Sequence, residues 1–359
     1  MIRIRSLIGA MAAVVAAMAM TQSSAIAQTT INLTAIDGYP PKSLWIKEFI
    51  EFYIPEVDKR LAKDNKYKIR WNQAWGGQIV KPNGVLEGLQ KGLGDIGIVT
   101  TAIYGDKMNI LSVAYATPFV TSDPRLVAVT IDAMAEKFPA IKKTFASYNQ
   151  VYLTNSVVLD SYQVFTKPSV KGLGDLKGLK IAGAGFNLRY LGPLGAVGVS
   201  APLVNYYNQI QTGVVEGCLL WPEAAATFKI AEVAPNMLKA DIGAVNTKVL
   251  TVNADTWKRL PDEVKTVLQA VAIEYRDLLA KLAADEGAES IAVYKKAGGT
   301  VNDLPKAERT RWARELPNIA KDWASGLDKE GAQGTEMLKY YMDAMRAAKQ
   351  PIERQWDRE

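Results

Sequence analysis

The sequence of 359 residues contains no histidine and a single cysteine. Without histidine the chain lacks the commonest general base and metal ligand, which excludes histidine-based hydrolytic triads. Cys218 alone can form neither an intramolecular disulfide nor a thiolate metal site. A Walker sequence and a Gly-x-Ser-x-Gly motif are missing too. These absences lower the expectation of catalysis, and we predict a protein that is not an enzyme and holds neither a metal nor a cofactor.

The N-terminus lacks an apolar run long enough to cross a membrane. Arg3 and Arg5 precede a run from Leu7 to Met20, shorter than the roughly 20 residues that a membrane-spanning helix needs. The small-x-small sequence Ala25-Ile26-Ala27 follows. We predict that residues 1–27 are a secretory signal peptide cleaved after Ala27, and that the mature chain is periplasmic without stable membrane insertion. No cysteine lies near the junction, which disfavours a lipid anchor.

Runs of positive charge are absent as well. Lysine and arginine number 43 against 37 acidic residues, and cleavage of the signal peptide removes two arginines, which lowers the net charge from +6 to +4. This small excess is spread along the chain, so nucleic acid is not an expected partner. With 48% hydrophobic and 22% charged residues, the composition suits a globular protein with a sizeable core.

Short strands alternate with helices in two blocks on either side of Val151. This rhythm and the chain length predict an α/β protein of two lobes, with the chain crossing between them. We assign residues 28–152 plus about 247–285 to lobe I, 153–246 plus about 286–340 to lobe II, and 341–359 to a C-terminal segment. The expected strands are 30–35, 67–72, 96–99, 152–159, 163–166, 179–182, 214–221 and 249–252.

One long helix is predicted between Pro261 and Lys296. After its first residue this stretch contains no proline, its only glycine is Gly287, and its apolar residues recur at the spacing of one helical face. Such a helix would be roughly 54 Å long, whereas a lobe of this size is about 30 Å across. It would therefore run along both lobes. The alternative is two helices broken near Gly287.

A glycine turn, Gly183-Ala184-Gly185, follows the expected strand 179–182 and precedes an expected helix. Position 188 is leucine where a dinucleotide-binding loop has its third glycine, and the acidic residue expected about 20 residues later is missing, so dinucleotide binding is improbable. The turn still offers backbone N–H groups to an anion. Arg189 would add a guanidinium suited to a carboxylate. The alternative for Arg189 is a solvated surface residue.

Four segments, in order, carry a family resemblance. They are GGQIVKPNGVLEGLQKGLGDIGIV (76–99), YATPFVTSDP (115–124), LGDLKGLKI with LGAVGVSAPLVNYYNQIQTGVVEG (within 173–217), and VLTVNADTWKRLPDEVKTVL (249–268). Together they resemble the substrate-binding subunit of tripartite ATP-independent periplasmic (TRAP) transporters, of the dicarboxylate-binding-protein type. The match covers most of the mature chain.

The resemblance implies a fold and a function. Proteins of this family have two α/β lobes around a hinge and a helix that spans both, and they close on a small organic acid. They deliver it to a small and a large membrane subunit, which import it with a sodium gradient. The sequence departs from the family after GLKI, where an arginine usually binds the substrate carboxylate and this chain has Ala182. Either Arg189 replaces that arginine, or helix N–H groups and neutral donors hold the anion.

The remaining candidate ligand-binding residues lie within the segments that resemble the family or in the loops that follow expected strands. For each aromatic residue the alternative is packing in a lobe core. The aromatic residues, with the space left at Ala182, suggest a monocarboxylate with an aromatic or otherwise bulky body. The full set of candidates is Arg189, Asn187, Phe186, Tyr207, Trp221, Glu223, Gln78, Tyr39, Tyr104 and Asn253.

Two other functions remain open at this stage. One is an exported enzyme that acts on a small organic acid through carboxylates or tyrosines, which the missing histidine disfavours. The other is a sensor subunit that presents the bound ligand to a receptor kinase. The sequence does not separate this sensor from a transport protein; neighbouring genes for two membrane subunits would.

Overall fold

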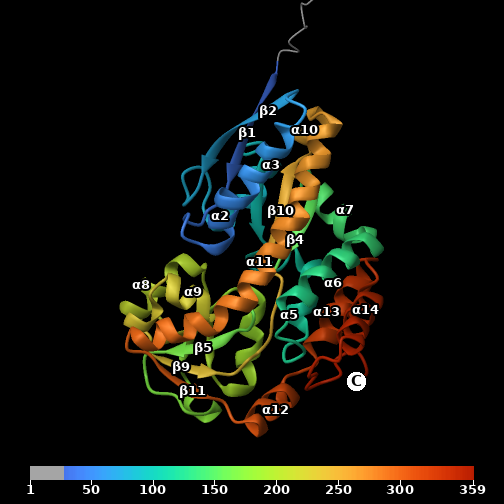
Figure 1. The fold of residues 1–359 in the computed structure, drawn as a ribbon. Coiled ribbons are helices and arrows are strands. Elements are labelled where there is room, and N and C mark those ends of the chain that lie inside the picture. Colours follow the sequence, from blue (N-terminus) through green and yellow to red (C-terminus); the bar gives the residue numbers. More distant parts are fainter. Residues whose placement is uncertain (1–27) are drawn as a thin grey trace, which may run out of the picture.

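Two separate β-sheets form the framework of the protein (Figure 1). The computed structural model describes residues 28–359, so the predicted signal peptide 1–27 lies outside the described residues. The first sheet has five strands in the order β2-β1-β3-β10-β4, and the second has six in the order β11-β9-β5-β8-β6-β7. We call the parts built on these sheets lobe I and lobe II. The predicted two-lobed α/β class is confirmed.

The sheet of lobe I is mixed. β1 pairs in parallel with β2 and β3, whereas β10 lies antiparallel between β3 and β4. Every residue of β3 and β10 is buried, which explains their nearly continuous apolar runs. The strands are β1 (Thr29–Ile36), β2 (Tyr67–Ala74), β3 (Ile96–Thr100), β4 (Gln150–Ser156) and β10 (Lys248–Asn253).

The sheet of lobe II contains three strands that the sequence pattern did not predict, namely β7, β9 and β11. They are only four residues long, and β7 and β11 contain no fully buried residue, so they carry little hydrophobic alternation. The predicted strand 214–221 is shorter in the structure, as β8. The strands are β5 (Gln163–Thr166), β6 (Lys180–Gly183), β7 (Val197–Ser200), β8 (Gly217–Leu220), β9 (Asn236–Lys239) and β11 (Thr300–Asp303).

Most helices cover the two sheets, and the last two return to lobe I. The helices of the lobe I segments are α2 (Leu44–Glu48), α3 (Ile54–Leu61), α4 (Val85–Gln90), α5 (Val113–Ala116), α6 (Pro124–Lys137), α7 (Pro139–Ser147) and α10 (Ala254–Arg259). Those of the lobe II segments are α8 (Tyr206–Gln211), α9 (Pro222–Thr227) and α12 (Lys306–Glu315). The last two are α13 (Ile319–Lys329) and α14 (Gly334–Ala347).

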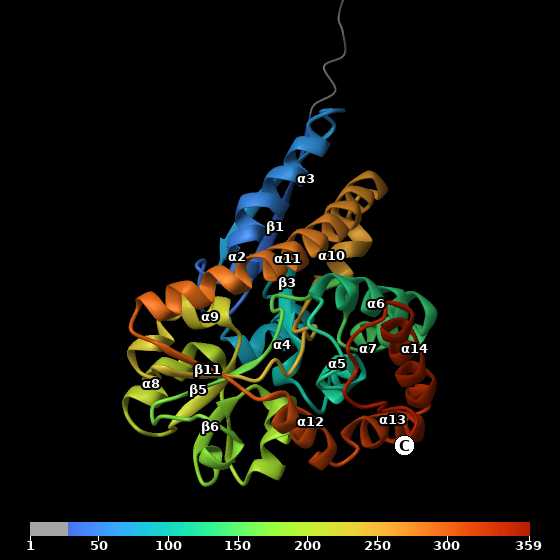
Figure 2. The same ribbon diagram turned by 60° about the horizontal axis from the view of Figure 1, so that its bottom comes forward.

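The segment 286–340, assigned to lobe II from the sequence, divides in the structure. β11 extends the lobe II sheet beside β9, whereas α13 and α14 pack on α5 and α6 (Figure 2). Trp323 of α13 is buried, and its indole N–H donates to the Asn109 carbonyl at 2.7 Å. The apolar face of α13 therefore attaches to lobe I. The other lobe boundaries stay a prediction.

The long helix α11 (Asp262–Lys296) is continuous through Gly287. It packs on α3, α6 and β4 of lobe I and on α9 and β11 of lobe II (Figure 1). The prediction of one helix along both lobes is thus confirmed, and the alternative of a break near Gly287 is not observed.

Two chain segments cross side by side between the lobes, residues 157–162 after β4 and residues 240–247 before β10. The Ile242 N–H donates to the Tyr162 carbonyl at 3.1 Å, and the Thr247 N–H donates to the Ser156 carbonyl at 3.3 Å. The predicted strand 152–159 ends at Ser156 in the structure, because residues 157–159 belong to the crossing segment.

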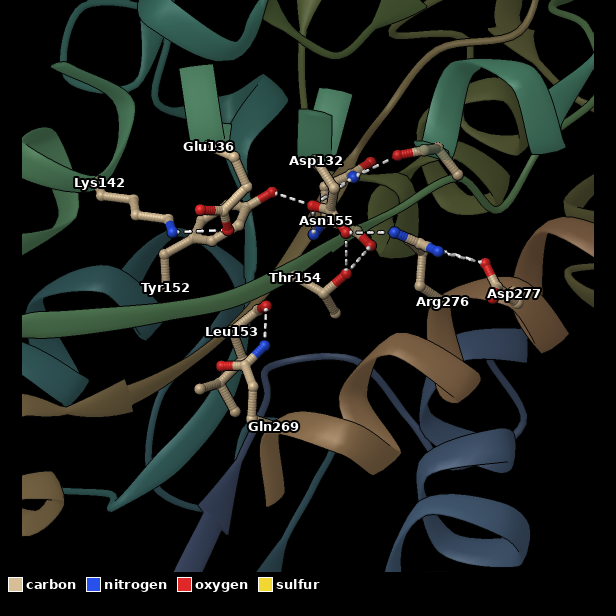
Figure 3. A network of polar contacts seen from close by, with 11 residues as sticks. Asp132, Glu136, Lys142, Tyr152, Leu153, Thr154, Asn155, Gln269, Arg276 and Asp277 are labelled. Atoms are coloured by element: carbon tan, nitrogen blue, oxygen red, sulfur yellow. Dashed lines mark hydrogen bonds and ion pairs between the residues drawn. The ribbon is translucent and has the colours of Figure 1, made fainter. Parts of the chain in front are cut away.

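A buried carboxylate fastens α11 to the strand that enters this crossing (Figure 3). Asp132 of α6 accepts hydrogen bonds from the Thr154 hydroxyl at 2.6 Å and from the Arg276 guanidinium at 2.8 Å. The Tyr152 hydroxyl and the Asn155 amide donate to it as well. The network joins α6, β4 and α11, which fixes lobe I against the middle of the long helix.

Candidate functional site

A cavity lies between the two lobes, where the ends of strands from both sheets meet. Its empty space amounts to about 350 Å³, the open mouth included. Lobe I and the crossing segments supply Tyr39, Thr100, Ala102, Tyr115, Tyr162, Thr247 and Lys248, and lobe II supplies Ala184, Leu203, Tyr206, Leu219, Leu220 and Trp221. Because both lobes form its walls, a bound molecule would contact both.

The lobes touch each other around this cavity. The Tyr190 hydroxyl of lobe II donates to the Tyr115 carbonyl of lobe I at 2.7 Å. The Lys42 ammonium, in the loop before α2, donates to the Thr227 carbonyl at the end of α9 at 3.2 Å. Gly185 lies so close to Ala102 that an added Cβ would stand 2.4 Å from its carbonyl oxygen. The structure therefore has the lobes closed.

Aromatic side chains dominate the walls. The rings of Tyr162 and Trp221 meet edge to face with centroids 6.0 Å apart, and the Tyr115 and Tyr162 hydroxyls are 3.1 Å apart. Burial raises the pKa of Tyr162 to about 12 and that of Tyr206 well above its ordinary value. The hydroxyls are therefore neutral at physiological pH and can donate hydrogen bonds to an anion.

Among the residues that line the cavity in the described part of the chain, Lys248 is the one with a formal charge. Its side chain is buried, with 2% of the residue exposed, and its ammonium donates to the Thr100 hydroxyl at 3.0 Å. The ammonium also lies 4.0 Å from the ring centroid of Trp45 and 4.8 Å from that of Tyr39, distances typical of cation–π interactions. The sequence-based candidates did not include Lys248.

Asp37 provides the opposite charge near Lys248. This buried carboxylate accepts hydrogen bonds from the Tyr39 N–H at 2.9 Å and from the Trp45 indole N–H at 3.1 Å. Burial lowers the pKa of Lys248, and the negative charge of Asp37 opposes that effect. Burial likewise raises the pKa of Asp37, and Lys248 opposes it. Each of the two groups therefore lowers the cost of charging the other.

Two polar side chains at the cavity region have no hydrogen-bond partner within residues 28–359. One is the hydroxyl of Thr247, which lines the cavity beside Lys248. The other is the amide of Asn187, which is completely buried near the Tyr162 hydroxyl without reaching hydrogen-bond geometry. Buried polar atoms normally have partners, so the Thr247 hydroxyl, which lines the cavity, is available to a ligand or to water.

Two of the predicted site residues line the cavity, Tyr39 and Trp221. Glu223 lies directly behind the latter, because its carboxylate accepts the Trp221 indole N–H at 3.0 Å and the Thr227 hydroxyl at 2.7 Å. Burial raises the pKa of Glu223. In this structure Glu223 therefore orients the tryptophan ring.

Arg189 lies outside the cavity lining. Residues Gly185–Leu194 form 3-10 turns instead of the expected α-helix, with Pro193 inside the segment. The start of this segment packs against the Ala102 carbonyl, and Ala184, directly before it, lines the cavity. The Arg189 side chain is exposed and stacks on Phe186, with the guanidinium carbon 4.4 Å from the ring centroid. Arg189 and the buried Phe186 therefore contact each other and do not line the cavity.

The other candidates are dispersed. The Tyr207 hydroxyl donates to Glu232 at 2.8 Å on the surface, while its neighbour Tyr206 lines the cavity. Gln78 is exposed. Tyr104 is buried, and its hydroxyl accepts the Leu86 N–H at 3.1 Å. Asn253 caps α10 by accepting the Asp255 and Thr256 N–H groups, at the end of β10 opposite to Lys248.

Ala182, where the resemblance predicts an arginine, is completely buried in β6. It pairs with Val199 of β7 and with Cys218 of β8. Position 182 therefore contributes no cation to the site.

Two lobes closed on a shared cavity, with one long helix spanning both, define a two-lobed solute-binding protein. The chain belongs to the family of bacterial extracellular solute-binding proteins, family 7 (DctP), whose model matches residues 56–326. Within residues 28–359 we find no helix with the length and apolar character needed to cross a membrane. The same residues contain no cluster of acidic and cysteine side chains suited to a metal ion.

Individual relatives are distant in sequence but close in fold. A solute-binding protein of Albidiferax ferrireducens is 24% identical over 83% of this chain and 87% of its own length. A TRAP solute-binding protein of Rhodoferax ferrireducens, crystallised with copurified benzoate, has a TM-score of 0.79 at 18% identity, over 89% of this chain and 98% of that one. DctP7 of Bordetella pertussis, which binds pyroglutamic acid, has a TM-score of 0.73 at 19% identity, over 89% and 99%.

Proposed function

We propose that the protein binds a small organic acid, a monocarboxylate with an apolar and often cyclic body, outside the cytoplasm. It delivers this acid to the small and large membrane subunits of a sodium-coupled TRAP transporter. In this scheme residues 1–27 are cleaved after Ala27 on export.

The observation that carries the proposal is the cavity between the lobes. Its walls are aromatic and aliphatic, its tyrosine hydroxyls are neutral donors, and it carries the charge of a single lysine. Apolar walls with a few placed polar groups are typical of sites for small organic ligands. Because both lobes line the cavity, ligand binding favours the closed state, which a membrane partner can recognise.

The similar structures support the same ligand class. Benzoate, bound to the Rhodoferax protein, and pyroglutamic acid, bound to DctP7, each carry one carboxylate on a ring. The identity to both is low, so these ligands are guides for choosing test compounds. This chain has Ala182 where the family usually has an arginine, so its cavity must hold a carboxylate through other residues.

Thermal melting of the mature protein, residues 28–359, tests the ligand class. The panel contains benzoate, 3-hydroxybenzoate, pyroglutamate, pyruvate and succinate, with benzamide, glucose and alanine as controls. A ligand present at 100 times its Kd adds about 2.7 kcal/mol to the free energy of unfolding, which raises the melting temperature by several degrees. We expect at least one monocarboxylate to do so. Stabilisation by the sugar or the amino acid alone would contradict the proposal.

Delivery and export need separate measurements. Proteoliposomes that contain the two membrane subunits should take up the bound acid only when this protein and an inward sodium gradient are both present. Uptake without the protein, or without sodium, would contradict the transport assignment. The intact mass of the protein secreted by a Gram-negative host should correspond to a chain that begins at Gln28.

A further inference from the structure

We propose that Lys248 is the cation that binds the carboxylate of the ligand, in place of the arginine absent at Ala182, and that it restricts the site to acids with one carboxylate. This inference rests on the proposed function.

The first argument is the coordination of the Lys248 ammonium. The group has three N–H donors, and among residues 28–359 one acceptor is in place, the Thr100 hydroxyl. The rings of Tyr39 and Trp45 stabilise its positive charge from one side but accept no conventional hydrogen bond. A buried ammonium is costly unless it is paired. Lys248 lines the cavity, so an anion bound there could accept the remaining N–H groups and complete the coordination of the ammonium.

The second argument is where the backbone places this lysine. Lys248 is the first residue of β10 and pairs with Thr100, the last residue of β3. It directly follows the segment that crosses between the lobes, and the adjacent Thr247 hydroxyl is buried without a partner among the described residues. The ammonium and this hydroxyl can each donate to one oxygen of a carboxylate. A ligand held there would lie against the crossing segments, which connect the two lobes.

The third argument concerns selectivity. Residues 28–359 place no second cation in the cavity lining, and the remaining walls are aromatic or aliphatic apart from hydroxyls. The negative charge of ionised Asp37, which acts on Lys248, would repel a second carboxylate of the ligand. A second carboxylate on the ligand would be desolvated without a counter-ion, which is strongly unfavourable. The site therefore prefers a monocarboxylate to a dicarboxylate.

Binding should also be linked to proton uptake. Burial lowers the pKa of Lys248, and a bound carboxylate would raise it. The Lys248 ammonium is therefore protonated in the complex, whereas a fraction of the free protein molecules lacks this proton. The titratable groups that face Lys248 are Asp37 in the loop after β1, Tyr39 in the same loop, and the cavity tyrosines Tyr115, Tyr162 and Tyr206. The pKa of each tyrosine is raised by burial, so Asp37 is the one that shares the titration range.

Isothermal titration with benzoate, or with the acid of the panel that stabilises the protein most, tests the inference. The variants are Lys248→Met, which keeps the length and removes the charge, and Arg189→Met as the matched control. We expect Lys248→Met to weaken acid binding about 10- to 150-fold, the value of a charged hydrogen bond. The control should bind within about twofold of the natural protein. Benzamide, which lacks the charge, should not distinguish the three proteins.

A second measurement covers the case that Lys248→Met does not fold. The binding enthalpy of the natural protein, recorded at about pH 8 in buffers of different ionisation enthalpy, should reveal proton uptake. The affinity for the acid should fall as the pH rises through about 7, where the Lys248 ammonium of the free protein loses its proton. Unchanged acid binding by folded Lys248→Met, or pH-independent binding without proton uptake, would overturn the role of Lys248 and leave the proposed function standing. If no acid binds the natural protein at all, both proposals fail.

Discussion

Gly287 of the long helix lies directly against the carboxylate of Asp160 in the crossing segment. A Cβ at position 287 would stand 2.5 Å from Oδ2 and 3.1 Å from Cγ of Asp160. The carboxylate is partly held in place, because its Oδ1 accepts the Ser161 N–H at 2.7 Å. The helix thus passes the crossing segment 157–162 at the one glycine of its 35 residues, where a larger residue would collide with Asp160.

We expect Gly287→Ala to lower the free energy of unfolding by about 1 kcal/mol, because the added methyl displaces Asp160. Helix propensity alone predicts the opposite, a gain of up to about 1 kcal/mol. Gly326 of α13 is the matched control, since no atom lies within 4 Å of its added Cβ. Gly326→Ala should therefore stabilise the protein. Urea unfolding measures both, and equal stabilisation by the two substitutions would show that Asp160 yields freely.

Asp160 should also make stability depend on pH. Burial raises the pKa of its carboxyl from 3.8 to about 6. The folded state therefore favours the protonated form, so the contribution is complete below about pH 4 and is lost as the pH rises through about 6. Over this range the folded protein should lose about 3 kcal/mol of its free energy of unfolding.

Asp160→Asn removes this titration. The difference in free energy of unfolding between Asp160→Asn and the natural protein should therefore increase, in favour of the variant, between about pH 4 and pH 7. Urea titrations at several pH values measure it. A difference that stays constant over this range would mean that the carboxyl titrates normally in the folded protein.

The ion pair between Asp132 and Arg276 gives a third prediction. Both side chains are about 90% buried, with 12% and 10% exposed. Asp132→Ala leaves the guanidinium without this partner and also removes the acceptor of Tyr152 and Thr154, so we expect a loss of about 3–5 kcal/mol. The exposed pair of Lys281 and Asp285, on the same helix, is the control. Asp285→Ala should leave the free energy of unfolding almost unchanged, because solvent screens an exposed pair. Similar losses for the two would contradict the anchoring role of the network.

The parts of the fold with strong periodicity could be predicted from the sequence. The long helix was predicted almost to its ends, because its apolar spacing and lack of proline extend over its whole length. The strands with buried apolar runs, such as β3 and β10, were predicted as well. The short edge strands β7 and β11 were not, since partly exposed four-residue strands leave little pattern.

The site was less accessible to sequence reasoning. Its place after a glycine turn makes Arg189 a candidate beside the alternative of a surface residue, and in the structure it is exposed within a segment of 3-10 turns and lies outside the cavity lining. The family resemblance names Tyr207, but its neighbour Tyr206 lines the cavity, and a rotation of about 100° between neighbouring helix residues separates the two. One signal for Lys248 was present, a lone charge at the edge of the buried strand VLTVN. Its proximity to Asp37 depends on the pairing of β10 with β3, which the sequence does not reveal.

The last prediction tests whether Trp221 contributes to ligand binding or to packing of the core. The indole lines the cavity, packs on Tyr162 and donates to Glu223. Trp221→Ala removes aromatic contact area from the ligand, so we expect affinity for the acid to fall about tenfold or more.

The control is Trp356, which is completely buried and donates to the Pro118 carbonyl at 3.0 Å, away from the cavity lining. Trp356→Ala should lower the melting temperature and leave the affinity of the folded protein unchanged. Calorimetric titration and melting of both variants provide the comparison. If Trp221→Ala lowers the melting temperature as much as Trp356→Ala while its affinity is unaltered, then Trp221 serves the core of lobe II and the ligand lies elsewhere in the cavity.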